Sequence, residues 1–174
     1  TSLTTLRNAT ACKVEKDIIS SLKTLGMPNV RFKVDITPTE APTPRGMDKV
    51  AFLFSANLGS PMQNISQVAS GGETARVMLS LKAMLSGAIS LPTIIFDEID
   101  TGVSGAIASQ MGEIMRQMAD ARQIITITHL PQVAARSQHH YLVYKQDTDV
   151  RTETHIRPLT IPEHEAEIEK MRTL

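Results

Sequence analysis

The stretch LPTIIFDEID, residues 91 to 100, decides the fold, because a short apolar strand ends there in carboxylates. A second apolar run, QIITIT at 123–128, follows an amphipathic segment at 104–119 whose spacing predicts a helix. Nearly continuous apolar strands are typical of a sheet that is covered on both faces. Strand, helix and strand in this order predict an α/β fold with parallel strands and a right-handed crossover.

The segments on either side extend this pattern. The alternating run VRFKVDI at 30–36 predicts a half-buried strand, and KVAFLFSA at 49–56 is expected to pair with it antiparallel. The Pro- and Thr-rich stretch at 37–48 is predicted to be a loop. Helices are predicted at 3–25, 72–88, 130–137 and 163–172, and a closing pair of strands at 141–145 and 150–156.

The composition is that of an ordinary globular protein of one domain's length, with 174 residues and 41% hydrophobic side chains. Its 18 basic side chains balance its 18 acidic ones, so net charge does not indicate a nucleic-acid surface. Cys12 is the single cysteine, which excludes an internal disulfide and fits a reducing cytosol. No apolar run is long enough to span a bilayer. Because the chain begins with Thr1, we expect a fragment or a processed protein.

Residues 70–73, Ser-Gly-Gly-Glu, precede a predicted helix and permit two interpretations. In a capping box, Ser70 caps the helix and the Glu73 side chain reaches back to the backbone N–H of Ser70. In a phosphate site, Gly71 and Gly72 remove side chains from the electropositive helix N-terminus, so that an anion can approach the backbone N–H groups. The two interpretations are compatible, and the motif alone does not choose between them.

Polar side chains follow both apolar strands, at the edge of an α/β sheet where ligands bind. Asp97 and Glu98 end the first strand, and His129 follows the second. Asp97 is placed to hold Mg²⁺, directly or through water, and Glu98 to orient and deprotonate an attacking water. His129 is placed to hydrogen-bond a γ-phosphate or that water. The alternative is that the two acids form a solvated strand end and that the histidine is structural.

The segment DTGVSG at 100–105 predicts a flexible turn before the next helix. For Ser104 the favoured interpretation is an ordinary helix cap. Asp100 is a candidate for a contact across an interface. No zinc site is predicted at HEAEIE, because His164 has no second histidine four residues further on.

These four motifs, in this order, resemble those of the ATP-binding-cassette superfamily: SGGE its signature, TIIFDE its Walker B strand and catalytic glutamate, DTGVSG its D-loop and ITH its switch histidine. Ile99 stands where transporter cassettes usually have proline, and Glu73 where they commonly have glutamine. Both features resemble the SMC-type ATPases of chromosome maintenance and DNA repair. The resemblance covers nearly the whole chain. Thr74 and Ala75 stand where the family commonly has a Leu-Ser or similar pair, a departure that leaves Ser70, Gly71 and Gly72 intact.

The resemblance implies the C-terminal lobe of a split ATPase head, since the chain has no G-x-x-x-x-G-K-[ST] loop. A separate N-terminal lobe would carry that P-loop. Residues 1–27 would be a helix where a coiled-coil arm re-enters the head, with an ordinary packing helix as the alternative. Residues 28–174 would form the lobe, an α/β structure with a mostly parallel sheet flanked by helices and additional antiparallel strands.

The resemblance also implies ATP and Mg²⁺ as cofactors, and a homodimer whose two heads sandwich ATP. Residues 70–73 would contact ATP bound to the other head, Asp97 would help hold Mg²⁺, Glu98 would activate water and His129 would sense the γ-phosphate. The intact bacterial protein would act on DNA in double-strand-break repair and recombination, in the cytoplasm at the nucleoid and without a membrane. The isolated chain is expected to be inactive. The alternatives are a transporter-like cassette and a non-catalytic dimerisation module.

Overall fold

The computed structural model describes residues 2–67, 71–86, 91–103, 105–148 and 150–173. Contacts divide the chain into two compact units. Unit 1 comprises Thr1–Leu91 and Thr101–Val103, and unit 2 comprises Pro92–Asp100 and Ser104–Leu174. In the described part of the chain, no helix combines the length and the apolar character that a membrane span needs.

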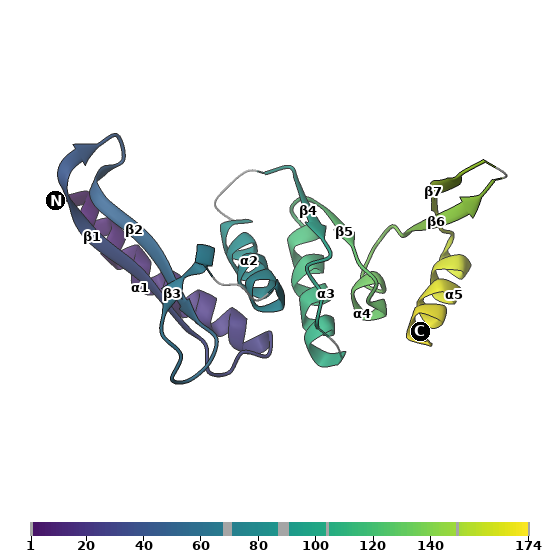
Figure 1. The fold of residues 1–174 in the computed structure, drawn as a ribbon, viewed down its shortest axis with the longest axis horizontal. Coiled ribbons are helices and arrows are strands. Elements are labelled where there is room, and N and C mark those ends of the chain that lie inside the picture. The colour runs from purple at the N-terminus through teal and green to yellow at the C-terminus, as the bar shows by residue number, and fades with distance from the viewer. Residues whose placement is uncertain (1, 68–70, 87–90, 104, 149, 174) are drawn as a thin grey trace. The chain divides into compact units, whose positions relative to one another are not determined.

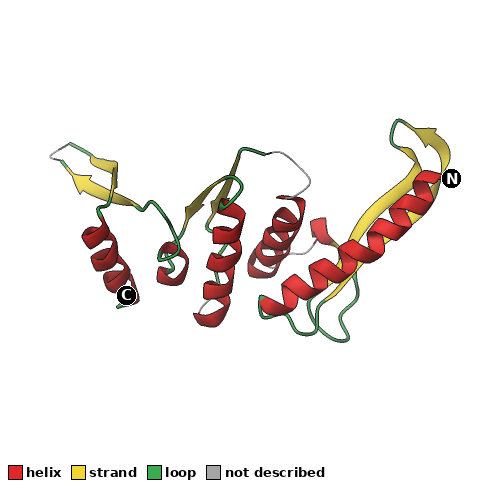
Figure 2. Ribbon diagram, turned by 180° about the vertical axis from the view of Figure 1, so that it is seen from behind, coloured by secondary structure: helices red, strands yellow, loops and turns green. Residues whose placement is uncertain are grey.

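Unit 1 contains a long helix, an antiparallel hairpin and a second helix (Figure 1). Its elements are α1 (Ser2–Thr24), β1 (Arg31–Thr43), β2 (Gly46–Ser55), β3 (Gln63–Asn64), a 3₁₀ turn (Ile65–Gln67) and α2 (Gly71–Ser86). The predicted antiparallel pairing of the first two strands is confirmed, and β3 adds a short third strand beside β2. Helix α1 lies along the hairpin, as Figure 2 shows from behind, so it packs within this unit. A coiled-coil arm continuing from it stays a proposal.

The apolar face of the hairpin is made by cross-strand pairs, because alternate residues of each strand share a face. The pairs are Phe32–Phe54, Val34–Phe52 and Ile36–Val50. Phe32 and Phe54 are only 4% and 2% exposed, whereas Phe52 and Val50 are 37% and 43% exposed. The face is therefore closed at one end of the hairpin and open at the other.

The strands are longer than the alternating pattern predicts, since β1 continues to Thr43 and β2 begins at Gly46. The predicted loop at 37–48 is therefore wrong. Prolines are tolerated there because β1 is an edge strand of its sheet, where a missing N–H breaks no ladder on the open side. The register shifts between Pro38 and Thr43, which accommodates the irregular stretch.

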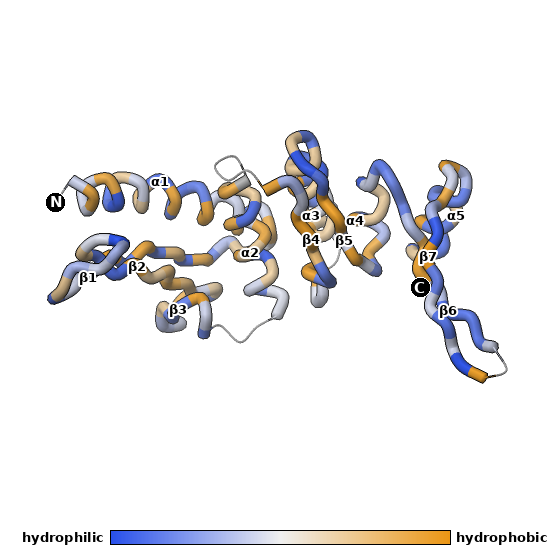
Figure 3. The backbone as a smooth tube through the Cα atoms, turned by 90° about the horizontal axis from the view of Figure 1, so that it is seen from above, coloured by the Kyte–Doolittle hydropathy of each residue, from blue (hydrophilic) through white to orange (hydrophobic). Residues whose placement is uncertain are grey.

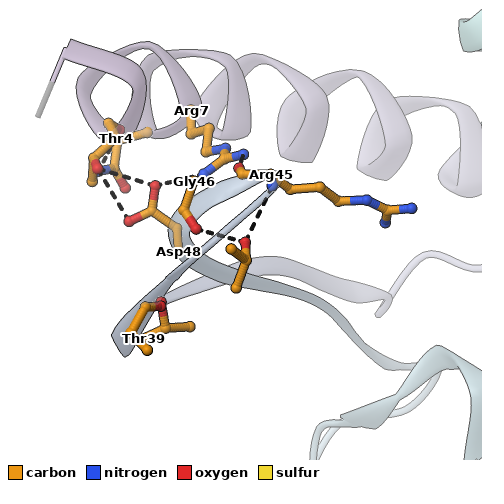
Figure 4. A network of polar contacts seen from close by, with 9 residues as sticks. Thr4, Arg7, Thr39, Arg45, Gly46 and Asp48 are labelled. Atoms are coloured by element: carbon orange, nitrogen blue, oxygen red, sulfur yellow. Dashed lines mark hydrogen bonds and ion pairs between the residues drawn. The ribbon is translucent and has the colours of Figure 1, made fainter.

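Polar contacts attach the start of α1 to the turn of the hairpin (Figure 4). The Arg7 guanidinium donates to the Asp48 carboxylate at 2.7 Å, and the Thr4 hydroxyl donates to the same carboxylate at 3.0 Å. Arg7 also donates to the carbonyl oxygen of Arg45. The Arg7 hydrogen bond holds the pKa of Asp48 below its ordinary value. Gly46 has a φ of 99°, a backbone conformation that favours glycine and lets the chain turn here.

Unit 2 begins with a strand–helix–strand crossover. Its elements are β4 (Thr93–Asp97), α3 (Gly105–Ala119), β5 (Gln123–Ile127), α4 (Pro131–Ala134), β6 (Tyr141–Asp147), β7 (Thr152–Pro158) and α5 (Ile161–Arg172). The predicted parallel pairing of β4 with β5 is confirmed, as is a closing antiparallel pair, β6 with β7. The unit therefore joins parallel and antiparallel strands in an α/β arrangement.

The two faces of the β4–β5 pair differ. Ile94 and Phe96 are buried, and Thr126, which is paired with Phe96, contacts Met115 of α3 through its hydroxyl. The opposite face carries the exposed isoleucines Ile95, Ile125 and Ile127, at 58%, 42% and 51%. Figure 3 shows the hydrophobic character of both strands. The coverage of both faces that apolar strands predict is thus not supplied by the described residues.

Candidate nucleotide site

The carboxyl ends of β4 and β5 bring the candidate acids and the candidate histidine to one edge of the sheet. Asp97 is paired with Ile127, and the backbone N–H of Glu98 donates to the Ile127 carbonyl at 3.1 Å. His129 follows two residues after Ile127. The side chains of Asp97, Glu98 and His129 are all exposed. The structure therefore places these residues at the shared edge, available to a ligand, while their chemical roles stay predictions.

Glu98 has a left-handed backbone conformation, with a φ of 46°. Among the described residues it is the only one other than glycine with a positive φ. This conformation costs an L-amino acid roughly 1–2 kcal/mol. Strain of this kind persists where the surrounding structure enforces it, and it is frequent at active sites. It marks the turn between β4 and the following segment as a candidate site independently of the carboxylate.

The donor atoms at this edge fit magnesium. The described residues contain no group of three His, Cys, Asp or Glu side chains able to enclose a metal ion. Mg²⁺ does not need such a cage, because it usually retains several waters and takes one or two carboxylates together with phosphate oxygens. The exposed carboxylates of Asp97 and Glu98 are suited to that partial coordination. The remaining ligands would have to come from water and from a phosphate.

The two glycines at the start of α2 differ in their surroundings. Ser70 lies outside the described residues, and with it the proposed capping box to Glu73. A Cβ atom at Gly71 would meet nothing within 4 Å, whereas one at Gly72 would lie 3.1 Å from the carbonyl oxygen of Thr101. Gly72 therefore permits a close backbone approach, while Gly71 leaves the helix N-terminus open to an anion.

Asp100 is buried, with only 1% of its surface exposed. Its carboxylate accepts a hydrogen bond from the hydroxyl of Thr128, the residue before His129. The side chain is thus directed toward Thr128 within its own unit, and a contact of Asp100 across an interface stays a prediction. Ser104, the predicted helix cap in the same motif, lies outside the described residues. Sequence reasoning missed Thr128, although a hydroxyl residue between an apolar strand and a candidate histidine was a visible signal.

A histidine pair links the segment before β6 to α5, and sequence reasoning missed it too. The Nδ1 atoms of His140 and His164 lie 2.9 Å apart, and the rings meet edge to face. Burial, and secondarily the charge of His164, hold the pKa of His140 below its ordinary value, while Glu167 acts in the opposite direction. The pair lies in unit 2 and supports the packing of its last helix.

Solved structures with a similar fold are heads of SMC ATPases. The Smc head domain of Pyrococcus yayanosii, with a coiled coil and joint, matches with a TM-score of 0.66 and 18% identity over 96% of this chain and 30% of that chain. The Smc head domain of Pyrococcus furiosus, bound to the C-terminal domain of ScpA, matches with a TM-score of 0.63 and 18% identity over 96% of this chain and 39% of that chain. The chain therefore has the fold of an SMC-type ATPase head.

Within that class, the sequence matches bacterial RecN. The DNA repair protein RecN of Deinococcus radiodurans is 41% identical over 154 residues, which cover 88% of this chain and 27% of that protein. RecN of Bacillus subtilis is 40% identical over 181 residues, covering 95% of this chain and 31% of that protein. No family model matches. The chain is thus similar to a segment of RecN, and it spans less than a third of the length of these relatives.

Proposed function

We propose that the chain is the C-terminal lobe of an SMC-like ATPase head, and that the intact protein uses ATP in repairing and recombining broken DNA. The observation that carries this proposal is the pair of exposed acids, Asp97 and Glu98, at the end of β4 and beside the strand that leads to His129. The SMC-type fold and the similarity to DNA repair proteins support the same function. The reaction is hydrolysis of ATP, in which a water oxygen bonds to the γ-phosphorus and the bond from that phosphorus to the β–γ bridging oxygen breaks, giving ADP and phosphate.

Each residue at the sheet edge has a distinct role in this proposal. Asp97 supplies an oxygen ligand to Mg²⁺, which offsets charge on the phosphates when it is bound. Glu98 orients a water molecule and accepts its proton as the oxygen attacks phosphorus. His129 donates a hydrogen bond to the γ-phosphate. Because all three side chains are exposed, they can reach a nucleotide held by another part of the protein.

The signature residues act on the nucleotide of a second head. The P-loop of that head holds the phosphates, and Ser70 with the N–H groups of Gly71 and Gly72 contacts the γ-phosphate from the other side. The open space beside Gly71 supports such an approach. ATP then favours the closed homodimer because it binds well only when both heads contribute, and hydrolysis releases them.

Two open apolar surfaces support the proposal that another lobe of the intact protein packs against this chain. The isoleucines of β4 and β5 form one of them. The other is a trough of about 540 Å³ in unit 1, between α1, the hairpin and α2. Its walls include the exposed residues Leu6, Val50, Phe52, Met78 and Leu85. Exposed apolar patches of this kind mark interaction sites. We assign them to the remainder of the same protein, including its P-loop lobe.

DNA binding and cellular location are proposed for the intact protein rather than for this chain alone. The balanced charge of this chain does not indicate a nucleic-acid surface. DNA contact is therefore assigned to the intact assembly, which would act in the bacterial cytoplasm at the nucleoid. A transporter-type cassette is less well supported, because Ile99 replaces the usual proline and the similar proteins are DNA repair proteins.

The first test compares ATP hydrolysis by the intact protein, by the isolated chain and by the intact Glu98→Gln variant. The intact protein is expected to hydrolyse ATP, and the isolated chain is not. Glu98→Gln keeps the size and backbone of the residue but removes the base, so hydrolysis should fall about a hundredfold or more while ATP-bound dimers accumulate. Robust turnover by the isolated chain, or full turnover by Glu98→Gln, would contradict the proposal.

The second test concerns the signature motif. Ser70→Arg in the intact protein should leave ATP binding to each head unchanged but prevent ATP-dependent dimerisation, which analytical ultracentrifugation measures. Leu58→Arg, at an exposed position, is the control for the added charge and bulk, and the protein with this substitution should dimerise normally. Equal dimerisation of Ser70→Arg and the unmodified protein would rule out a role of the motif across the interface.

A further inference from the structure

Asp100 is a buried carboxylate that is only partly hydrogen-bonded. One oxygen accepts from the Thr128 hydroxyl, and among the described residues no partner reaches the other, buried oxygen. Removing a carboxylate from water is costly unless its oxygens are paired. An apolar residue at this position would not carry that cost, so stability of the fold is a poor explanation for Asp100. The bond to Thr128 is the specific interaction that it makes.

Thr128 has a second hydrogen bond that connects it to the far side of His129. Its hydroxyl oxygen accepts from the backbone N–H of Leu130 at 3.0 Å while its proton goes to Asp100. Leu130 also precedes α4 as its N-cap residue. The residues on both sides of His129 are therefore fixed by one hydroxyl group, whereas the His129 side chain itself is exposed.

A backbone hydrogen bond also joins the segment of Glu98 to the segment that precedes His129. The Glu98 N–H donates to the Ile127 carbonyl. Two residues after Glu98, the Asp100 carboxylate accepts from Thr128, which directly follows Ile127. One backbone bond and one side-chain bond thus join the segment that carries the candidate base to the segment that carries the candidate histidine. Two successive bonds restrict the relative rotation of these segments, which a single bond does not.

We propose that Asp100 and Thr128 are positioning residues that hold His129 in register with Glu98 for ATP hydrolysis. Neither residue touches the reacting atoms. The inference rests on the proposed function, because it assumes that Glu98 and His129 act on one nucleotide. Catalytic groups lose efficiency when they are misplaced by about 1 Å, by up to about a hundredfold. The hydrogen bond between Asp100 and Thr128 should therefore affect the chemical step more than nucleotide binding.

The experiment measures steady-state ATP hydrolysis by the intact protein with substitutions at Thr128. Thr128→Val keeps the shape but removes the hydroxyl, so kcat should fall about tenfold or more while KM for ATP stays within about twofold. Thr128→Ser keeps the hydroxyl and should retain most of the activity. Thr126→Val is the matched control, because Thr126 lies two residues earlier, within β5, and the hydrogen bond of its hydroxyl among the described residues is to a methionine sulfur at 3.6 Å. It should leave kcat unchanged.

A double-mutant cycle provides a readout that a purely structural role would not give. Asp100→Asn keeps an acceptor oxygen and the shape of the side chain, so it should fold and reduce kcat less than Thr128→Val does. Combined with Thr128→Val, it should add little further loss, because the bond is already absent. If Thr128→Val melts below the assay temperature, the reduced kcat of Asp100→Asn, at unchanged KM, carries the test instead.

The outcomes separate the inference from the proposed function. An unmodified intact protein that hydrolyses no ATP would refute the proposed function itself. An active unmodified protein whose folded Thr128→Val variant keeps kcat within about twofold would overturn only the positioning role. Equal losses for Thr128→Val and Thr126→Val would also overturn it, since that result indicates a general effect on the strand.

Discussion

The hairpin β1–β2 and the parallel pair β4–β5 bury their apolar residues in different ways. The hairpin has one apolar face, which is closed where Phe32 meets Phe54 and open further along. The parallel pair has two apolar faces, and only the face of Phe96 is covered in the described chain. The hairpin therefore covers one end of its apolar face within its own unit, whereas the parallel pair leaves a whole face of isoleucines exposed, of the kind that is typical of a buried sheet.

This difference distinguishes residues that stabilise the folded chain from residues that stabilise its assembly with another surface. A side chain that is buried within its unit contributes to the stability of the isolated chain, since its transfer from water occurs on folding. A side chain on an open apolar face contributes only when another surface covers it. Substitutions on the two faces of β4–β5, and pH changes that act on one unit, test this division.

The largest expected effect is that of Phe96→Ala. Phe96 is 2% exposed, so its truncation leaves a cavity and should lower the free energy of unfolding by roughly 3–5 kcal/mol. The neighbouring Ile95→Ala is the control, because Ile95 is 58% exposed and should cost less than about 1 kcal/mol. Urea unfolding of the isolated chain measures both. Similar losses for the two variants would show that both faces are already packed in this chain.

A smaller effect on the chain, but a clear effect on assembly, is expected for the double substitution Ile125→Thr and Ile127→Thr. Thr keeps the branched shape that favours a strand, and both positions are about half exposed, so the isolated chain should unfold within about 1 kcal/mol of its original stability. Binding to the separately expressed remainder of the protein, measured by calorimetry, should weaken. Unchanged binding would remove this face from the interface.

The third effect is a loss of stability in mild acid that originates in unit 2. Because the folded protein holds the pKa of His140 below 6.5, the unfolded chain takes up a proton first as pH falls. The stabilisation is complete above pH 6.5 and is lost as pH falls through the lowered folded value. His140→Asn should flatten the dependence of the melting temperature on pH in this range. If the melting temperature of this variant depended equally steeply on pH, another titratable group would be the cause.

The smallest effect is expected at lower pH in unit 1. Arg7 lowers the pKa of Asp48 below 3.8, so the unfolded chain binds the proton more readily. Its stabilisation is present above pH 3.8 and is lost as pH falls further. Arg7→Met keeps much of the side-chain length, and it should reduce stability at pH 7 but not at pH 2. If the reduction were the same at both pH values, lost packing rather than charge would be its cause.

The sequence predicted those parts of the fold that have a local periodic pattern. The alternation at 30–36 predicted the paired strand, and the apolar runs before Asp97 and His129 predicted parallel strands with a shared edge. The Pro-rich extension of the hairpin was missed because proline usually indicates a loop, whereas an edge strand tolerates it.

The parts that could not be predicted depend on contacts between distant residues. Asp100 and Thr128 are 28 positions apart, and His140 and His164 are 24 apart. No periodicity links such pairs, so only the folded chain reveals them. The different surroundings of Gly71 and Gly72 are of the same kind, because the sequence alone presents two equivalent glycines.

The backbone conformation of Glu98 implies that selection for stability and selection for activity would favour different residues at this position. A glycine at this position would adopt the positive φ without the cost of roughly 1–2 kcal/mol, and asparagine would reduce it. A library of variants at position 98 that is selected only for thermal resistance should therefore be enriched in these two residues. Under the proposed function, in which Glu98 is the base, stabilising this chain by such a replacement would sacrifice ATP hydrolysis.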